Sequence, residues 1–182
     1  IKMEVERNDS PKDGFLQKVR DLATQKGIVL IFDECTSGFR ETFGGLHKKY
    51  GVEPDMAMFG KALGNGYAIT ATIGRREVME AAQSTFISST FWTERIGPTA
   101  ALKTLEVMLQ MESWKIIAKT ELSIRAGWQQ LAEIHGIEVA HWGVPALTGF
   151  SFSRDLDLAY KTLMTQEMLA KGYLASNSVY VS

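Results

Sequence analysis

Short apolar runs separated by amphipathic stretches predict alternating strands and helices in the first part of the chain. Ser10-Pro11 is a helix N-cap followed by proline, and apolar residues then recur at helical spacing until Gly27. The unbroken apolar run 28–32 has the length of a strand, and its lack of alternation is typical of a strand buried on both faces of a parallel sheet. Further strands are predicted at 56–59, 67–73 and 86–91.

The second part of the chain is predicted to be helical first and mixed afterwards. One helix begins at Pro98, and a longer amphipathic helix covers about 113–134. Beyond Gly136 the pattern predicts strands at 137–142 and 147–152, a helix near 156–171 and a last strand from Tyr173. We therefore predict an α/β portion over residues 1–111 and a connecting helix with a smaller α+β portion over residues 112–182.

Two polar residues follow the first two predicted strands. Asp33 ends the first strand, and Lys61 comes directly after the second. A strand, a connection and a second strand of the same sheet form a right-handed crossover, so the two strands should run parallel. Ligands of such sheets bind beyond the carboxyl ends of the strands, so both side chains should enter one crevice. Taken alone, the pair is better explained as a structural ion pair, which contributes little to stability.

Composition narrows the possible functions. The 182 residues are 45% hydrophobic, which is enough for a sizeable core, and the net charge of −1 disfavours binding to nucleic acid or to a membrane surface. No apolar stretch approaches the roughly 18 residues of a membrane span. The single cysteine, Cys35, excludes an internal disulfide and favours a reducing, cytoplasmic location. The three histidines lack the spacing of metal ligands, so no metal site is predicted.

Two linked motifs resemble those of the class III pyridoxal-phosphate (PLP) aminotransferases. Residues 30–40, LIFDECTSGFR, resemble the family signature in which aspartate and glutamate close a strand, and residues 51–67 resemble the region of the cofactor lysine. Lys61 lies 28 positions after Asp33, which matches the glutamate-1-semialdehyde aminomutase branch. The resemblance implies an α/β fold of the PLP-dependent transferase type I: a partial large domain with a mostly parallel sheet between helices, and part of the smaller C-terminal domain.

The resemblance also implies a role for each of five residues. Lys61 would form a Schiff base with PLP, and Asp33 would pair with the protonated pyridine nitrogen and keep the ring an electron sink. Thr90 would bind the cofactor phosphate, although an ordinary hydroxyl at a strand end explains it equally well. Cys35 replaces a valine common in relatives, and we expect it to make a small apolar contact with the ring. Glu34 would assist near the ring, with a structural hydrogen bond as the alternative.

One loop departs from the family pattern. Residues 92–98 stand where relatives have a short Gly-Asn-Pro turn, close to the active site. Trp92 and Glu94 either shape a pocket for a different amino donor, or Trp92 is simply packed; we favour packing. The departure argues against a standard mutase, whereas the spacing of Asp33 and Lys61 argues for one. A transaminase acting on another aldehyde or keto compound therefore stays open.

The chain is expected to be a fragment, because it opens like the tail of a strand and relatives are more than twice as long. The family's phosphate-holding loop and its ring-stacking aromatic residue cannot be located in this sequence. We therefore expect a PLP enzyme with a small amino or aldehyde substrate, working as a homodimer, and expect this chain alone to be inactive. The alternative is a truncated, non-catalytic family member that acts as a folding or assembly module. A third hypothesis is an unrelated α/β nucleotide-binding domain.

Overall fold

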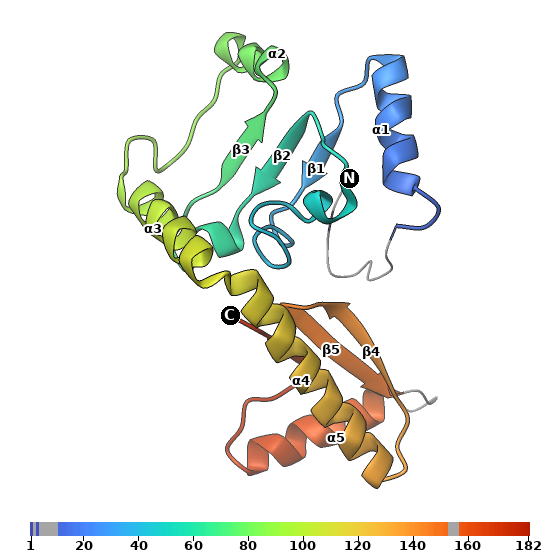
Figure 1. The fold of residues 1–182 in the computed structure, drawn as a ribbon. Helices are drawn as coiled ribbons and strands as arrows, with labels where there is room; N and C mark the ends of the chain where they lie inside the picture. Colours follow the sequence, from blue (N-terminus) through green and yellow to red (C-terminus); the bar gives the residue numbers. More distant parts are fainter. Residues whose placement is uncertain (2, 4–10, 153–156) are drawn as a thin grey trace. The chain divides into compact units, whose positions relative to one another are not determined.

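A computed structural model describes residues 1, 3, 11–152 and 157–182, which form two compact units, Ile1–Trp114 and Lys115–Ser182 (Figure 1). The first unit contains α1 (Phe15–Lys26), β1 (Ile31–Asp33), η1 (Leu46–Tyr50), β2 (Met56–Phe59), η2 (Lys61–Leu63), β3 (Ala71–Gly74), α2 (Arg76–Met79), η3 (Glu80–Ser84) and α3 (Ile96–Met111), where η marks a 3₁₀ turn. The helix α4 (Ser113–Ile134) begins in the first unit, and the second continues with β4 (Val139–Val144), β5 (Leu147–Phe152), α5 (Asp157–Ala170) and β6 (Ser178–Tyr180). The division into domains 1–111 and 112–182 stays a prediction.

The sheet of the first unit places the ends of β1 and β2 at one edge. The two strands pair in parallel, with Phe32 opposite Ala57 and Asp33 opposite Met58. The predicted parallel pairing of the two strands is therefore confirmed. The third strand, β3, pairs with β2 in the antiparallel direction, so the described part of this sheet is mixed (Figure 1). The α/β class predicted from the sequence is confirmed.

The expectation that residues 28–32 form a strand buried on both faces is wrong. The strand begins only at Ile31, because the N–H of Ile28 bonds the Ala23 carbonyl at 2.8 Å and so completes the C-terminal cap of α1. The side chains of Ile28, Val29 and Ile31 are 58%, 45% and 38% exposed. The buried side chain of this strand is Phe32, which packs in a cluster with residues of α1 and the loop before β2.

Other predicted elements also differ from the structure. The strand predicted at 67–73 is observed only as β3 from Ala71, and the last strand begins at Ser178 rather than Tyr173. The strand expected at 86–91 is absent, and its Phe86 side chain is 94% exposed. Apolar residues of high β-propensity still need a neighbouring strand to form a ladder, and none of the described strands pairs with this segment. The first helix begins at Phe15, because Asp13 and Gly14 before it have left-handed φ values of 49° and 67°. Its predicted cap, Ser10, lies outside the described residues.

The second unit is an antiparallel sheet with helices against it. The strand β5 lies between β4 and β6, and Trp128 of α4 packs on Phe150 with ring centroids 5.0 Å apart. Arg125 of α4 donates to the hydroxyl of Thr148 at 2.8 Å and to the Gly143 carbonyl at 2.9 Å, which ties the helix to the hairpin. The helix 113–134 and the strand 147–152 have the bounds that the apolar pattern predicted.

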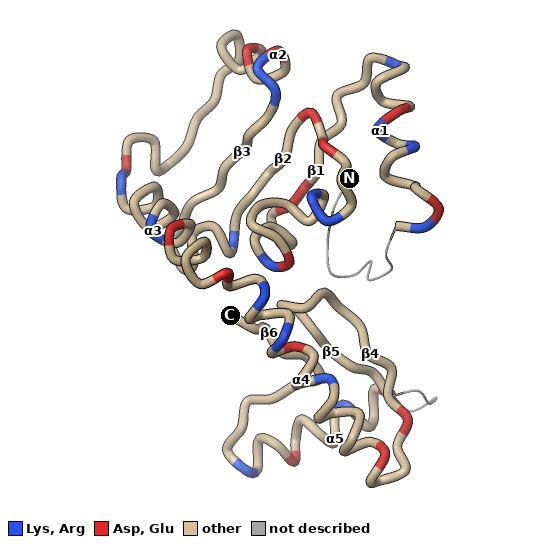
Figure 2. The backbone as a smooth tube through the Cα atoms, in the orientation of Figure 1, with Lys and Arg blue, Asp and Glu red and all other residues tan. Residues whose placement is uncertain are grey.

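The described residues show neither a long run of like charge nor a helix suited to a membrane. Acidic and basic residues are interspersed along the described backbone without a long stretch of one sign (Figure 2). In the part of the chain that the structure describes, no helix has both the length and the apolar character needed to cross a membrane.

Candidate active site

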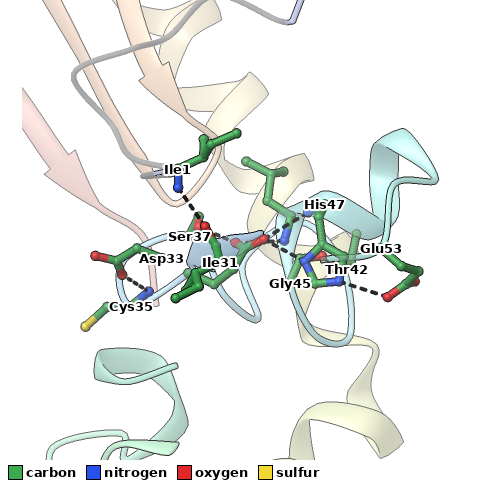
Figure 3. A network of polar contacts seen from close by, with 11 residues as sticks. Ile1, Ile31, Asp33, Cys35, Ser37, Thr42, Gly45, His47 and Glu53 are labelled. Atoms are coloured by element: carbon green, nitrogen blue, oxygen red, sulfur yellow. Dashed lines mark hydrogen bonds and ion pairs between the residues drawn. The ribbon is translucent and has the colours of Figure 1, made fainter. Parts of the chain in front are cut away.

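Asp33 is fixed at the carboxyl end of β1 by its own side chain. Its Oδ1 accepts a hydrogen bond from the N–H of Cys35 at 3.0 Å, which closes a tight local turn (Figure 3). The next N–H, that of Glu34, donates to the Met58 carbonyl of β2 at 2.8 Å and extends the ladder by one bond. The carboxylate of Asp33 is half-buried and held in one orientation at the edge of the sheet.

Glu34 points into the protein and is fully buried. Its Oε1 accepts hydrogen bonds from the His47 N–H at 3.0 Å and from Nδ1 of the same residue at 2.8 Å. Its Oε2 accepts from the Leu46 N–H at 2.9 Å and from the Ser37 hydroxyl. Burial works against the charged carboxylate, but the hydrogen bonds from His47, Ser37 and Leu46 outweigh it and lower the pKa of Glu34.

These contacts give Glu34 the structural role that the sequence left open. They fasten residues 34–47 into a closed loop, in which His47 also approaches the exposed Glu53 at 3.6 Å (Figure 3). Gly45 is required in this loop, because a Cβ there would lie 2.3 Å from Nδ1 of His47 and 2.8 Å from the Glu34 carboxylate. A contact of Glu34 with the cofactor stays a prediction that this geometry does not favour.

Lys61 lies just beyond β2, at the same edge as Asp33. It starts η2 with a left-handed φ of 40°, which is unusual for a residue with a side chain. Its Nζ donates to the hydroxyl of Thr36 at 2.5 Å. The residue also lines an open cavity of about 580 Å³, together with Tyr67, Ala68, Ile69, Thr70, Ser89, Phe91, Trp92, Glu94 and Pro98. Asp33 does not line this cavity, so the predicted shared crevice is present only as a shared edge of the sheet.

Two glycines set the backbone around Lys61. A Cβ at Gly64 would lie 2.2 Å from the Tyr67 carbonyl oxygen, and a Cβ at Gly60 would lie 2.9 Å from the sulfur of Cys35. The turn carrying Lys61 therefore packs closely against the rest of the protein at both glycines. That these glycines let the backbone approach a cofactor stays a prediction. Cys35 contacts this turn from the β1 side, so its sulfur fills space beside the lysine loop.

The loop after η3 holds Thr90 apart from the other predicted residues. Thr90 is exposed in a turn, and it does not line the cavity of Lys61 although Ser89 and Phe91 do. The prediction that Trp92 is packed is wrong, because the described residues leave its side chain 69% exposed. Glu94 caps α3 by accepting hydrogen bonds from the N–H groups at its start, including that of Gly97 at 3.1 Å.

Asp55 is a buried acid that the sequence reasoning did not single out. It precedes β2 and accepts hydrogen bonds from the Leu30 N–H at 2.8 Å, from Arg20 at 2.8 Å and from Arg75 at 3.0 Å. Burial opposes the charge, but these three donors lower the pKa of Asp55. The carboxylate ties α1, β1 and the segment after β3 to the start of β2, and so fixes the strands whose far ends carry Asp33 and Lys61.

The structure therefore brings Asp33, Cys35 and Lys61 to one edge of the sheet and adds Thr36 to them. Thr90 lies in an exposed turn and does not line the cavity of Lys61, and Glu34 is occupied by its own buried donors. Thr36 lies within the motif 30–40, but the sequence assigned it no role, since a hydroxyl in a loop has many possible partners and its contact is 25 positions away. Among the described residues, no group of three or more histidine, cysteine or acidic side chains has the geometry to hold a metal ion.

Comparison with known proteins gives consistent matches. The family model for aminotransferase class III matches residues 9–173. A 3-aminobutyryl-CoA aminotransferase of Cloacimonas acidaminovorans (strain Evry) is 40% identical over 86% of this chain. A glutamate-1-semialdehyde 2,1-aminomutase of Geotalea daltonii is 34% identical over 80% of it. This chain spans only 38% and 35% of the length of these two relatives.

Solved structures match the fold. The PLP internal aldimine form of the FumI protein of Sphingopyxis sp. MTA144 superposes with a TM-score of 0.84 at 25% identity, over 92% of this chain and 41% of that one. An omega-transaminase of Sphaerobacter thermophilus superposes with a TM-score of 0.80 at 24% identity, over 93% of this chain and 43% of that one. Both likenesses extend across nearly all of the present chain.

Proposed function

Because the chain belongs to the class III aminotransferase family, as its motifs around Asp33 and Lys61 predicted, we propose that it provides the reactive lysine of a PLP-dependent amino-group transfer. The substrate would be a small molecule with an amino group next to, or exchanged with, a carbonyl group. The chain covers less than half of its relatives, so the proposal concerns the part of the reaction that its own residues perform.

The observation that carries the proposal is the placing of an amine and a carboxylate at adjacent strand ends. Asp33 and Lys61 both follow strands that pair in parallel, with Asp33 in register with Met58. PLP, when bound, supplies an aldehyde that reacts with amines and a pyridine ring that stabilises negative charge on a substrate carbon. The residues present fit such a group, because Lys61 opens into a cavity and the glycines beside it let the backbone come close.

Each residue would then have a distinct task. The amine of Lys61 would hold the cofactor covalently until a substrate amine replaces it, and would afterwards carry a proton to and from the substrate carbon. The carboxylate of Asp33 would hold the proton on the ring nitrogen. The turn between Asp33 and Cys35 keeps that carboxylate from rotating. Thr90, Cys35 and Glu34 stay predicted contacts of the cofactor.

The relatives do not separate a transaminase from a mutase. The matches include an aminotransferase at 40% identity and several aminomutases at 32–34%. The spacing of Asp33 and Lys61 favours a mutase, whereas residues 92–98 favour a transaminase. A mutase needs no external amino acceptor, so turnover of a candidate amine with and without an added keto acid or aldehyde distinguishes the two. A homodimer and a cytoplasmic location belong to the same proposal.

The experiment that tests the proposal is trapping of the cofactor on lysine. The chain is incubated with PLP, reduced with borohydride and digested, and each lysine is examined for a pyridoxyl adduct by mass spectrometry. We expect a stoichiometric adduct on Lys61, and its loss in Lys61→Ala. Labelling spread over many lysines would support the non-catalytic alternative for this chain. If Lys61 also stays unlabelled in a longer form of the protein, the proposed function is wrong.

A further inference from the structure

Thr36 presents a buried hydroxyl to the amine of Lys61. Its side chain is only 8% exposed, and its Oγ1 lies 2.5 Å from Nζ of Lys61. The two residues come from different elements, the loop after β1 and the turn after β2, so the contact links the two strand ends at the level of the reactive side chain.

The loop holds Thr36 firmly from both sides. On one side, the N–H of Cys35 donates to the Asp33 carboxylate at 3.0 Å. On the other, the N–H of Gly38 donates to the Glu34 carbonyl at 2.8 Å. The carbonyl of Thr36 itself accepts a hydrogen bond from Nε of Arg40 at 2.6 Å. With its backbone fastened in this way, Thr36 offers its hydroxyl at a fixed position.

Lys61 has the opposite character. Its side chain is exposed on an open cavity and has four rotatable bonds, and ordering such a side chain costs conformational entropy. Its backbone is fixed by the turn η2, so the freedom that remains lies in the side chain. A fixed acceptor within reach of Nζ reduces that freedom.

We propose that Thr36 is a positioning residue, whose hydroxyl holds the amine of Lys61 at the edge between β1 and β2, where an incoming aldehyde meets it. The inference rests on the proposed function, since it gives Thr36 a purpose only if Lys61 reacts. It assigns Thr36 no contact with the reacting carbon. It predicts that the hydroxyl speeds capture of a bulky aldehyde but matters little to a small reagent that approaches from any direction.

The test compares two reactions of the same amine. The chain is exposed to limiting PLP, reduced with borohydride at successive times, and the adduct on Lys61 is measured relative to that on Lys103, an exposed lysine of the same unit. Parallel samples are acetylated with acetic anhydride. Thr36→Val should slow the relative PLP labelling about five-fold, the effect of losing one hydrogen bond of ordinary net strength. Its relative acetylation should change less than about two-fold.

Matched variants separate positioning from folding. Thr36→Ser keeps the hydroxyl and should restore the rate of PLP labelling, whereas Thr36→Ala lacks it and serves if the valine variant does not fold. Ser37→Ala removes the neighbouring hydroxyl, whose partner is Glu34, and should destabilise the loop without changing the relative labelling. Circular dichroism checks that each variant is folded.

The outcomes distinguish the two proposals. If the unsubstituted chain labels Lys61 no faster than Lys103, the non-catalytic alternative for this chain is supported and the role of Thr36 is overturned. The proposed function itself is contradicted only if a longer form of the protein also leaves Lys61 unlabelled. If Lys61 is labelled preferentially and Thr36→Val leaves that preference unchanged, the role of Thr36 alone is overturned. The same holds if Thr36→Ser is as slow as Thr36→Val.

Discussion

Replacing Glu34 by glutamine changes one oxygen to an NH₂ group in the middle of a fully buried cluster of donors. The carboxylate accepts hydrogen bonds from two backbone N–H groups, those of Leu46 and His47, with one on each oxygen. Glutamine has a single acceptor oxygen. Whichever way its amide is turned, the NH₂ group faces one of these backbone N–H groups, which then loses its partner.

The magnitude follows from that count. A buried N–H without a partner costs about 1–3 kcal/mol, and weakening the remaining bonds from charged to neutral costs about 1 kcal/mol more. We therefore expect Glu34→Gln to destabilise the chain by about 3 kcal/mol, a large share of the roughly 5–15 kcal/mol of a typical domain. Glu53→Gln is the matched control, because Glu53 approaches the same histidine at 3.6 Å but its side chain is 76% exposed; it should change stability by less than about 0.5 kcal/mol.

The pH dependence of stability provides a second test of the role of the Glu34 carboxylate. Burial disfavours the charge of Glu34, but its donors prevail and hold its pKa below the usual 4.5. The stabilisation is therefore complete above pH 4.5 and is lost as the pH falls through the lower pKa of the folded state. The difference in unfolding free energy between the unsubstituted chain and Glu34→Gln should be constant near neutral pH and should become smaller in acid.

The assay is urea unfolding combined with hydrogen exchange of the Leu46 and His47 amides. We expect both amides to exchange faster in Glu34→Gln and to be unchanged in Glu53→Gln. Two results would refute the assignment of Glu34 as the acceptor that closes the loop. One is equal stability of Glu34→Gln and Glu53→Gln. The other is a loss of unfolding free energy in Glu34→Gln that stays the same in acid.

Three further predictions follow from other contacts. Asp33→Asn should keep the fold and the pyridoxyl adduct on Lys61, because the amide oxygen can still close the local turn, but it should slow amino transfer in a steady-state assay. Gly64→Ala should destabilise the lysine turn by more than about 2 kcal/mol in thermal unfolding and reduce labelling of Lys61, since the added methyl group overlaps a carbonyl oxygen. Burial and a nearby arginine lower the pKa of His141, so the second unit should lose stability as the pH falls below 6.5; His141→Phe, which keeps the ring on Trp128, should remove that loss in pH-dependent unfolding followed by hydrogen exchange.

The sequence predicted those elements whose pattern is set locally. The strand 56–59 and the helix 113–134 were found at their observed bounds, because each has a continuous apolar signal and a clear end. The strand expected at 86–91 failed because a strand exists only with a partner, and no local pattern reports one. The apolar pattern predicts strand at Ile28, but its N–H completes the cap of α1, because hydrogen bonding rather than hydropathy decides its conformation.

The site divides along the same line. Asp33 and Lys61 could be placed together, because parallel strands bring their carboxyl ends to one edge and the motifs identified the residues. Glu34 could be a helper or a structural acceptor until its donors were located 12 and 13 positions away. The roles of Thr36 and Asp55 could not be predicted. The side chain of each makes its cited contacts with residues at least 20 positions away, which neither spacing nor composition reveals.

The left-handed backbone of Lys61 affects which substitutions at this position would be favoured during evolution. A lysine at a φ of 40° is less stable there than glycine or asparagine by roughly 1 kcal/mol, because its Cβ crowds the following carbonyl. A single nucleotide change turns a lysine codon into an asparagine codon. In a lineage that makes no use of the amine, such a mutation would relieve strain and spread without cost. Selection for stability alone therefore works against lysine at this position, a cost that the proposed role of the amine would explain.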